Sequence, residues 1–467
     1  MESLARIVGL GNVLTDPADT LPYGTDWRGS DALAPAMVAR PGSTAECAAL
    51  LREAAAQGLR VIPAGGRTGL AGGIVPIAAN APVLTISLER MNRIRTVDPT
   101  DMSIAVEAGC TVEAVQNAAA EADRLFPLSF GAQGSAMIGG ALSTNAGGIR
   151  ALRYGTARDL VLGLEVVLPD GRVLDDMRRV RKDNTGYALR HLFVGAEGTL
   201  GLITAASLKL YPALRQRETA FVAVQTPEAA LALYARMQGC GAELVAFELC
   251  GQRTIQLTVQ NGPRLRAPVP LVTPWFCIIE IAATHPALPL RAIMEDSLAA
   301  AMEAGECVDV MIAENEDTRA MLWRMRESTP DAVRQAGPSV PTDTAVPVSA
   351  VPRFIADVER ESAARWPEGH VMSIGHLGDG NIHINLQAPG PEVPRAEWYA
   401  RAAGFDAMVN HLAVAAGGSF SAEHGIGTGK LKAMAAMKDP VAVSVMHSIK
   451  AAIDPAGMMN PGKLLPG

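Results

Sequence analysis

Several sequence features are missing from this 467-residue chain, and each absence excludes a class of protein. No uncharged apolar run reaches the roughly 18 residues that a membrane-spanning helix needs, so we expect no transmembrane segment. There is no Lys/Arg tract and the formal net charge is −7, which argues against a nucleic-acid partner. The 6 cysteines include no Cys-x-x-Cys pair, which argues for reduced thiols and against an iron–sulfur cluster.

Two further motifs are absent. The first residues lack a basic segment followed by a long apolar core, so we expect no secretory signal and a cytoplasmic location. Neither G-x-G-x-x-G nor G-x-x-x-x-G-K-[ST] occurs, so a bound phosphate is not expected to be held in Rossmann or P-loop fashion. What the chain has is length and apolar content. With 49% hydrophobic residues it can fill more than one core, since single cores stop growing near roughly 250–300 residues.

The first half predicts an α+β domain. Residues 1–35 are expected to form a loose lead-in rich in Gly, Asp, Thr and Pro. Ser43 and Glu46 predict a capping box that opens a helix through Gln57, and Gly58 is expected to end it. Further elements are expected as strands at 60–63, 82–88 and 103–107 and as a helix at 112–125.

The pattern changes near residue 220 and predicts a second α+β domain, an antiparallel sheet with helices on one face. Its expected helices are 227–238, 289–304 and 318–335, and its expected strands are 245–249 and 275–283. The helical stretches 396–416 and 441–452 are expected to close the chain, followed by a turn-like tail.

Three glycine clusters lie in the first half, at 65–73, 131–148 and 195–201. Any one of them is consistent with ordinary turns. Together they favour close approach of backbone N–H groups to a phosphate-bearing, flat ligand, because glycine lets the backbone turn its donors toward an anion. The side chains of Ser135, Ser143, Thr144 and Asn145 are expected to add further donors.

Two histidines, His376 and His383, lie on either side of a Leu-Gly-Asp-Gly stretch between two predicted strands. If residues 378–381 form the loop of a hairpin, the two histidines face each other roughly 5 Å apart at Cβ. Asn385 then points to the same strand face as His383. Solvated or structural histidines are the alternative.

Downstream, Glu423 would complete a His/His/Glu set that leaves coordination positions open for substrate, and His424 would be left as a candidate base. A metal-dependent hydrolase that uses these four residues is one alternative function.

Considered together, these segments resemble a known family. The segments Pro63–Leu70, Gly134–Gly148 and Glu197–Gly201 resemble the FAD domain of the vanillyl-alcohol-oxidase/p-cresol-methylhydroxylase (PCMH) superfamily. The motifs around His376, His383 and Glu423, with Asn460-Pro461-Gly462-Lys463, resemble its D-2-hydroxyacid dehydrogenase branch. That branch includes D-2-hydroxyglutarate dehydrogenase, D-lactate dehydrogenase and the glycolate oxidase flavin subunit. A non-catalytic FAD-binding subunit of a glycolate-oxidase-like complex is therefore a further alternative function.

The resemblance implies a fold and a domain order. Residues 36–213 are expected to form a two-part PCMH-type FAD-binding domain, and residues 214–420 a cap domain for the substrate. Residues 421–467 are expected to return to the flavin site as a helical C-terminal segment. The first glycine loop contains no histidine, so FAD is expected to be non-covalent. The residues expected to bind it are Pro63, Gly65, Gly66, Arg67, Thr68, Gly69, Leu70, Gly134, Ser135, Ile138, Gly139, Gly140, Ser143, Thr144, Asn145, Gly147, Gly148, Glu197, Gly198, Ile203 and Asn460.

The resemblance also implies a reaction, the oxidation of a D-2-hydroxy acid to the 2-oxo acid by hydride transfer to flavin N5. His376, His383 and Glu423 would hold one divalent ion, zinc or manganese, which lowers the pKa of the substrate hydroxyl. His424 would then act as base, with Arg326 and Asn385 contacting substrate. The expected electron acceptor is external, an electron-transfer flavoprotein or a quinone-linked protein, and the expected assembly is a homodimer.

One departure from the hydroxyglutarate enzymes concerns the stretch 339–343, where a substrate-binding lysine is expected. Pro341 stands there and no lysine is nearby. This leaves Arg326 as the main group to bind substrate carboxylate, although an arginine in a helical stretch is by default solvated. The sequence therefore leaves D-2-hydroxyglutarate, D-lactate and similar acids open as substrates.

Overall fold

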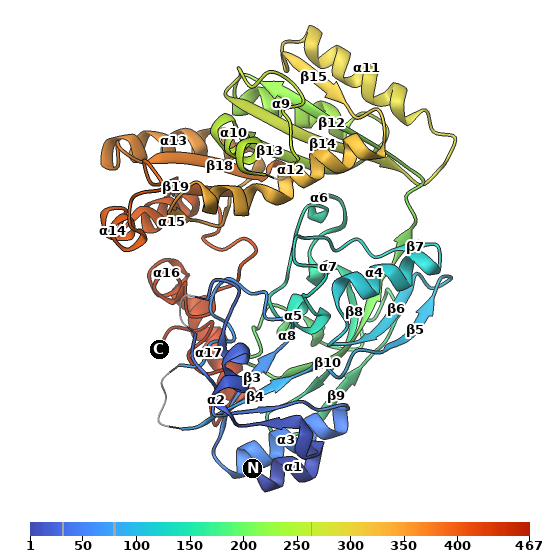
Figure 1. Cartoon of the computed structure of the whole chain (residues 1–467). Coiled ribbons are helices and arrows are strands. Elements are labelled where there is room, and N and C mark those ends of the chain that lie inside the picture. The colour runs from blue at the N-terminus through green and yellow to red at the C-terminus, as the bar shows by residue number, and fades with distance from the viewer. Residues whose placement is uncertain (30–31, 78–80, 263) are drawn as a thin grey trace. The chain divides into compact units, whose positions relative to one another are not determined.

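The computed structural model describes residues 1–29, 32–77, 81–262 and 264–467. The chain divides into two compact units, each described here by itself (Figure 1). Unit 1 comprises residues 1–148, 154–213 and 423–467, and unit 2 comprises residues 149–153 and 214–422. Both units mix helices and strands, so the α+β fold class is confirmed.

Unit 1 contains a four-stranded sheet in the order β1-β2-β4-β3. Its strands are β1 (Val13–Leu14), β2 (Met37–Ala39), β3 (Arg60–Ala64) and β4 (Val83–Ser87). β4 runs parallel to β2 and β3, whereas β1 is antiparallel to β2. The crossover from β2 to β3 is α3 (Thr44–Ala56), which buries Leu50 and Leu51.

The start of α3 follows the predicted cap only in part. The Ser43 hydroxyl accepts the Glu46 N–H, but the Glu46 carboxylate accepts from the N–H of Gly42 rather than Ser43. The reciprocal half of the capping box is therefore displaced by one residue. After α3, Gly58 has a φ of +66°, which suits glycine and ends the helix as expected.

A second sheet of unit 1 is antiparallel, five-stranded and ordered β5-β6-β10-β8-β9. Its strands are β5 (Ile94–Asp98), β6 (Ser103–Glu107), β8 (Val161–Val167), β9 (Val173–Asp176) and β10 (Leu202–Lys209), while β7 (Arg124–Leu125) pairs with β11 (Tyr211–Pro212). The predicted helix 112–125 ends earlier, as α4 (Val112–Glu121), because Asp123 adopts a φ of +57° and the chain then enters β7.

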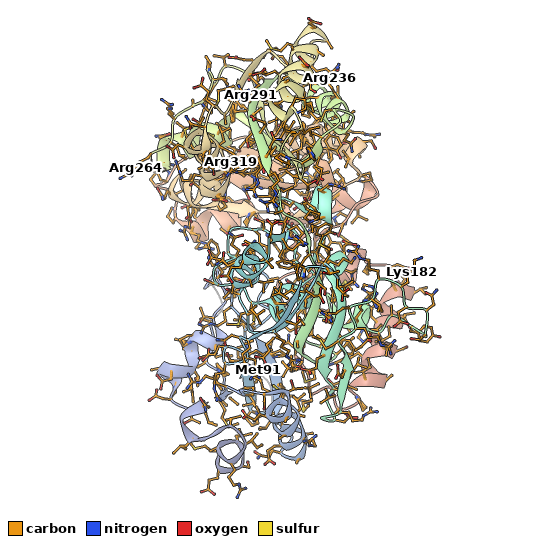
Figure 2. All side chains as sticks on the ribbon, turned by 90° about the vertical axis from the view of Figure 1, so that its right-hand side faces the viewer. Met91, Lys182, Arg236, Arg264, Arg291 and Arg319 are labelled. Atoms are coloured by element: carbon orange, nitrogen blue, oxygen red, sulfur yellow. The ribbon has the colours of Figure 1, made fainter. Side chains whose placement is uncertain are left out.

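The remaining helices of unit 1 are short except at the C-terminus. They are α1 (Glu2–Val8), α2 (Pro17–Thr20), α5 (Ile138–Ser143), α7 (Ala157–Leu160), α8 (Arg190–Phe193), α16 (Leu431–Met437) and α17 (Pro440–Ile453), while α6 (Ala151–Tyr154) spans the division between the units. Met91, labelled in Figure 2, is fully buried in unit 1, with its sulfur 3.6 Å from Cys47 Sγ.

Residues 1–29 are not the loose lead-in that the sequence predicts, and residues 30–31 of that predicted segment lie outside the described residues. Leu4 and Val8 of α1 are buried, and β1 joins the first sheet by pairing Val13 with Ala39. The Trp27 N–H donates to Gly69 O, and Asp26 accepts the Gly72 N–H. This segment therefore braces the first glycine loop.

Unit 2 is built on an eight-stranded antiparallel sheet with the path β15-β12-β14-β13-β18-β19-β16, and β17 also pairs with β19. Its strands are β12 (Gln216–Val224), β13 (Glu243–Gly251), β14 (Trp275–Ala283), β15 (Asp309–Ile312), β16 (Ser339–Pro341), β17 (Thr344–Ala345), β18 (His370–His376) and β19 (Asn381–Gln387). Its helices are α9 (Pro227–Gln238), α10 (Gln252–Asn261), α11 (Leu290–Glu303), α12 (Glu316–Gln335), α13 (Val351–Arg365), α14 (Arg395–Arg401) and α15 (Phe405–Ala415).

Helices cover both faces of this sheet, which corrects the prediction of one covered face (Figure 1). Alternate strand residues build two cores. Cys277 and Ile279 of β14 pack with α9, α11 and α13 on one face, whereas Phe276 and Ile278 pack with α10 and α12 on the other. We call the second side the α12 face. It carries the candidate catalytic groups of unit 2.

In the part of the chain that the structure describes, no helix combines the length and the apolar character needed to cross a membrane. The cysteines at 47, 110, 240, 250, 277 and 307 are free thiols. Burial raises the pKa of the Cys47 thiol well above its ordinary value and that of the Cys250 thiol to about 12, so neither thiol is expected to be reactive.

Candidate functional site

The two histidines lie on adjacent strands, but their register differs from the prediction. His376 ends β18 and pairs with Asn381, while His383 pairs with Ile374. The turn takes in residues 377–379 as a 3₁₀ segment, and Gly380 follows with a φ of +76°. The predicted direct pairing of His376 with His383 is therefore wrong, because this turn closes the hairpin earlier than a loop at 378–381 would.

The register nevertheless brings the imidazoles together, because a shift of two residues keeps a side chain on its own face. The rings of His376 and His383 lie with their centroids 6.0 Å apart and their planes at 82°. Asn385, two residues after His383, shares their face. Its cross-strand neighbour on β16 is Pro341, the residue at the expected lysine position.

A buried carboxylate that the sequence analysis missed stands beside His376. Glu248 of β13 is the direct cross-strand partner of His376 and is 0% exposed. Its Oε1 lies 2.6 Å from His376 Nδ1, and its Oε2 accepts from Arg326 Nε at 2.5 Å. Burial alone would raise the pKa of Glu248, but the charges and hydrogen bonds of His376 and Arg326 lower that pKa to about 2.

Arg326 is therefore not the solvated arginine that its helical position suggests by default. It comes from α12, is only 9% exposed, and turns toward the sheet to meet Glu248. A buried charge needs a partner of opposite charge. The acidic Glu248 within the apolar stretch Val245–Leu249 therefore indicated, in the sequence, that a basic partner is present.

His383 has an acidic neighbour of its own. Asp343 is 2% exposed, with Oδ1 at 3.7 Å from His383 Nδ1. Asn381 Nδ2 donates to the same Oδ1 at 3.3 Å and to Thr344 O at 2.9 Å. Each imidazole of the pair thus lies near one buried carboxylate, an arrangement typical of metal-binding histidines.

In unit 1 the first two glycine clusters lie against each other. A Cβ added to Gly66 would come within 2.0 Å of Ser135 O, and one added to Gly65 would lie 3.5 Å from Gly140 N. By contrast, a Cβ on Gly69 or Gly140 would meet no atom within 4 Å. Glycine at 66 is required by backbone packing, whereas Gly69 and Gly140 border open space.

The first loop also presents unused donors. Within the described part of the chain, no group accepts a hydrogen bond from the backbone N–H groups of residues 65–71. Buried or half-buried N–H groups normally find a partner, and a run of them beside open space fits a diphosphate. The residues present therefore fit FAD.

Other residues predicted to contact FAD make hydrogen bonds within the protein. The hydroxyls of Ser143 and Thr144 donate to Gly139 O and Gly140 O, one turn back, and their predicted contact with FAD stays a prediction. Asn145 Oδ1 accepts from Thr156 Oγ1 and from the Arg158 N–H. These side chains hold the turn after α5 in shape.

Six further residues of the predicted set make contacts within the protein. Arg67 Nη1 donates to Pro22 O, with the guanidinium 4.7 Å above the Tyr23 ring. Gly198 lies against Pro63, where a Cβ would come 2.8 Å from Cγ. Ile203 is a buried residue of β10. A Cβ on Gly148 would come 2.2 Å from Ser129 O, and one on Gly139 would meet Ala108 at 2.8 Å.

The remaining predicted positions show no specific contact that assigns a role. Ser135 and Gly134 are exposed, Thr68 and Leu70 are half-buried in the first loop, and Ile138 is buried in α5.

The segment that follows Glu423 is tied to these loops. Glu197 accepts the N–H groups of Ile426 and Gly427, both at 2.7 Å, and the Thr428 N–H donates to Ala71 O. Burial raises the pKa of Glu197, partly offset by these two hydrogen bonds. Glu197 thus holds the segment that bears Glu423 and His424, and its predicted FAD contact stays a prediction.

Glu423 itself lies next to the second glycine cluster, since a Cβ on Gly147 would come 3.3 Å from its Oε1. Asn460 Nδ2 donates to Glu197 O and Gly73 O, and its buried Oδ1 has no partner among the described residues. The C-terminal segment, the glycine loops and Glu197 form one assembly inside unit 1. Of the predicted metal ligands, His376 and His383 belong to unit 2 and Glu423 to unit 1.

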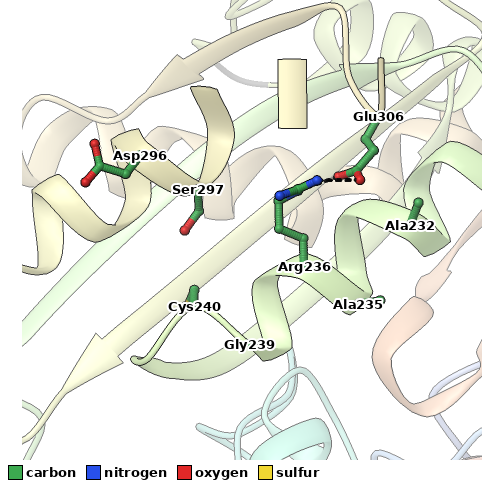
Figure 3. Close-up of a pocket in the computed structure, with 8 residues that line it drawn as sticks. All are labelled: Ala232, Ala235, Arg236, Gly239, Cys240, Asp296, Ser297 and Glu306. Carbon is green, nitrogen blue, oxygen red and sulfur yellow. Dashed lines mark hydrogen bonds and ion pairs between the residues drawn. The ribbon is translucent and has the colours of Figure 1, made fainter. Parts of the chain in front are cut away.

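A separate cavity of about 730 Å³ lies between α9 and α11 of unit 2 (Figure 3). Arg236 and Glu306 form an ion pair in its wall, with Nε–Oε2 at 2.6 Å. None of the predicted site residues lines this cavity.

Two family models match this chain. Residues 35–176 match the FAD binding domain, and residues 213–464 match the model described as FAD linked oxidases, C-terminal domain. The second match covers more than half of the chain. The chain belongs to the FAD-linked oxidase family. It is therefore an FAD-linked oxidoreductase.

Relatives within this family confirm the expected branch. A protein of Xanthomonas citri pv. viticola named D-2-hydroxyglutarate dehydrogenase is 36% identical over 99% of this chain and 96% of its own length. One of Rattus norvegicus, named D-2-hydroxyglutarate dehydrogenase, mitochondrial, is 35% identical over 98% of this chain and 83% of its own length.

Solved structures of two other proteins share the fold. p-Cresol methylhydroxylase with substrate bound superposes with a TM-score of 0.78 at 15% identity, covering 100% of this chain and 96% of that one. Alkyldihydroxyacetonephosphate synthase superposes with a TM-score of 0.75 at 16% identity, covering 99% and 85%. The PCMH-type fold is thereby confirmed.

Proposed function

We propose that this FAD-linked oxidoreductase is a divalent-metal-dependent dehydrogenase that oxidises a D-2-hydroxy acid, with D-2-hydroxyglutarate as the first candidate substrate. The observation that carries the proposal is the α12 face of unit 2. There, His376 lies beside His383, and His376 shares the carboxylate of Glu248 with the buried Arg326. A cation site next to an anion-binding group suits a hydroxy-carboxylate.

The proposed metal ligands are His376, His383 and Glu423. Two imidazoles and one carboxylate suit zinc and manganese alike, and the carboxylates beside the histidines add the outer hydrogen bonds that such sites use. When bound, the ion would lower the pKa of the substrate hydroxyl. The residues of this chain supply the donor set and hold its orientation.

Arg326 and Asn385 are the proposed substrate contacts. The guanidinium of Arg326 binds a carboxylate, and the amide of Asn385 donates to or accepts from the same molecule on the face that carries His383. Pro341 stands in place of the lysine that would contact a second carboxylate of the substrate. The names of the relatives nevertheless favour D-2-hydroxyglutarate over D-lactate.

His424 is the proposed base. An imidazole with an ordinary pKa near 6.5 accepts a proton from a hydroxyl only after that hydroxyl has become more acidic. Glu197 supports this role, because its two hydrogen bonds hold the backbone immediately after His424. When bound, FAD would accept the hydride from C2 of the substrate.

Three further parts of the proposal concern the electron acceptor, the oligomeric state and the cellular location. The reduced cofactor requires an external acceptor, for which we propose an electron-transfer flavoprotein or a quinone-linked protein. A homodimer and a cytoplasmic location also remain predictions.

Anaerobic mixing tests the proposal. The FAD-loaded protein is combined with D-2-hydroxyglutarate, L-2-hydroxyglutarate and D-lactate, and the flavin absorbance near 450 nm is followed. We expect bleaching with the D-2-hydroxyglutarate and none with the L enantiomer. His424→Ala should slow this reduction by about 10²–10⁴-fold without loss of FAD. Bleaching at the wild-type rate in His424→Ala would refute its role as base.

A further inference from the structure

Glu248 is a fully buried carboxylate that has no part in any step of the proposed reaction. Both of its oxygens are occupied, Oε1 by His376 Nδ1 and Oε2 by Arg326 Nε. One side chain therefore joins a proposed metal ligand to the proposed substrate arginine. Resting on the proposed function, we propose that Glu248 is a positioning residue that sets the tautomer of His376 and the orientation of Arg326 together.

The tautomer follows from the chemistry of the pair. An ionised carboxylate only accepts hydrogen bonds, so the proton of a neutral His376 must be on Nδ1. The lone pair then lies on Nε2, the nitrogen available to a divalent cation. With the opposite tautomer, Nε2 would carry hydrogen and could not be a ligand.

The orientation of Arg326 follows from the same contact. Its Nε–H donates to Glu248, and because the guanidinium is planar, one such bond fixes the plane of the whole group. β13 and β18 set this arrangement, since Glu248 and His376 are direct cross-strand partners. The sheet thus fixes the carboxylate to the histidine, and α12 brings the arginine to it.

The same sheet offers a matched control. Glu280 of β14 is 2% exposed and also holds α12, through Trp323 Nε1 at 2.7 Å and Arg319 Nη1 at 3.5 Å. Arg319 is labelled in Figure 2. Like Glu248, Glu280 is buried and contacts α12, but it contacts no histidine in the described structure.

The test compares Glu248→Gln with Glu280→Gln. A glutamine has one acceptor oxygen and an NH₂ group, so it satisfies one of two N–H donors and pushes His376 toward the wrong tautomer. We expect the dissociation constants of Zn²⁺ and Mn²⁺ to rise about 10- to 100-fold in Glu248→Gln. The KM for D-2-hydroxyglutarate should rise as well, while FAD content stays at the wild-type value.

Ion affinity is measured on the FAD-loaded proteins by competition with a fluorescent chelator, alongside thermal unfolding. Glu280→Gln should lower the melting temperature but leave both ion affinities unchanged. Equal ion affinity in Glu248→Gln and wild type would overturn the inference, as would an equal loss in Glu280→Gln. If wild type itself bound neither ion, the proposed metal dependence would fail instead.

Glu248→Asp covers the case in which the glutamine variant does not fold. Aspartate keeps the charge and both oxygens but is one methylene shorter, so it reaches His376 and Arg326 less well. We expect a native flavin spectrum with weaker Zn²⁺ binding than wild type. Wild-type Zn²⁺ affinity in a folded Glu248→Asp would count against the inference.

Discussion

Gly66→Ala tests whether the two glycine segments of unit 1 form the FAD site by close backbone packing. The added methyl group would lie 2.0 Å from Ser135 O and 2.9 Å from Ala136 Cα. Comfortable carbon–oxygen contacts begin near roughly 3.3 Å, so the second segment would have to move by more than about 1 Å. Overpacking of this kind costs about 1–3 kcal/mol.

If the segments separate when FAD is absent, this cost is borne by the FAD-bound state. It corresponds to an increase of about 5- to 150-fold in the dissociation constant of FAD. The assay is reconstitution of apoprotein with FAD, followed by flavin fluorescence. Gly131→Ala is the matched control, because that glycine lies in the same second segment and its Cβ would meet no atom within 4 Å. FAD affinity and apoprotein melting temperature both equal to wild type in Gly66→Ala would refute the packing argument.

Two further substitutions test the C-terminal segment. Glu197→Gln leaves one of the two buried N–H groups of Ile426 and Gly427 without an acceptor. We therefore expect the free energy of unfolding to fall by about 1–3 kcal/mol and turnover to slow. An unchanged melting temperature would contradict this expectation. Burial lowers the pKa of Lys463 to about 8, below its unfolded value, so between pH 8 and 10.5 the unfolded state binds more protons. Relative to Lys463→Met, wild-type stability should therefore rise with pH in that window, by at most about 1.4 kcal/mol per pH unit, in guanidinium titrations. Lys432→Met, on an exposed position of α16, should show no such slope difference.

Elements with strong local signals were predictable. The helix expected at 227–238 and the strand expected at 275–283 are found with those bounds, because Thr226 caps a Pro-initiated helix and the strand is apolar throughout. β12 was not predicted, since its first residues are polar and only its second half is buried. The predicted helix 396–416 is two helices, because Gly404 adopts a φ of +87° between them.

The residue types of the candidate site could be read from the sequence, but their contacts could not. The histidine pair was expected on one face, and the structure places it there through a different register set by the turn at Gly380. Glu248 and Asp343 were missed as neighbours of the histidines. Their roles depend on pairing between strands far apart in sequence, and nothing local indicates which strand lies beside β18.

The same limit applies to the N-terminal residues. Their composition is that of a loop, yet Asp26 and Trp27 hydrogen-bond to the first glycine loop across more than 40 positions of sequence. Single hydrogen bonds of this kind leave no periodic pattern. They become visible only when the sheets of unit 1 are in place.

The central claim is that a divalent ion held by this chain and its FAD act together on one D-2-hydroxy acid. The most direct measurement is the rate of anaerobic flavin bleaching by D-2-hydroxyglutarate before chelation, after chelation, and after Zn²⁺ or Mn²⁺ is returned. The account predicts a loss of bleaching with FAD still bound, and recovery when the ion is restored. Full-rate bleaching by protein stripped of divalent ions would contradict it.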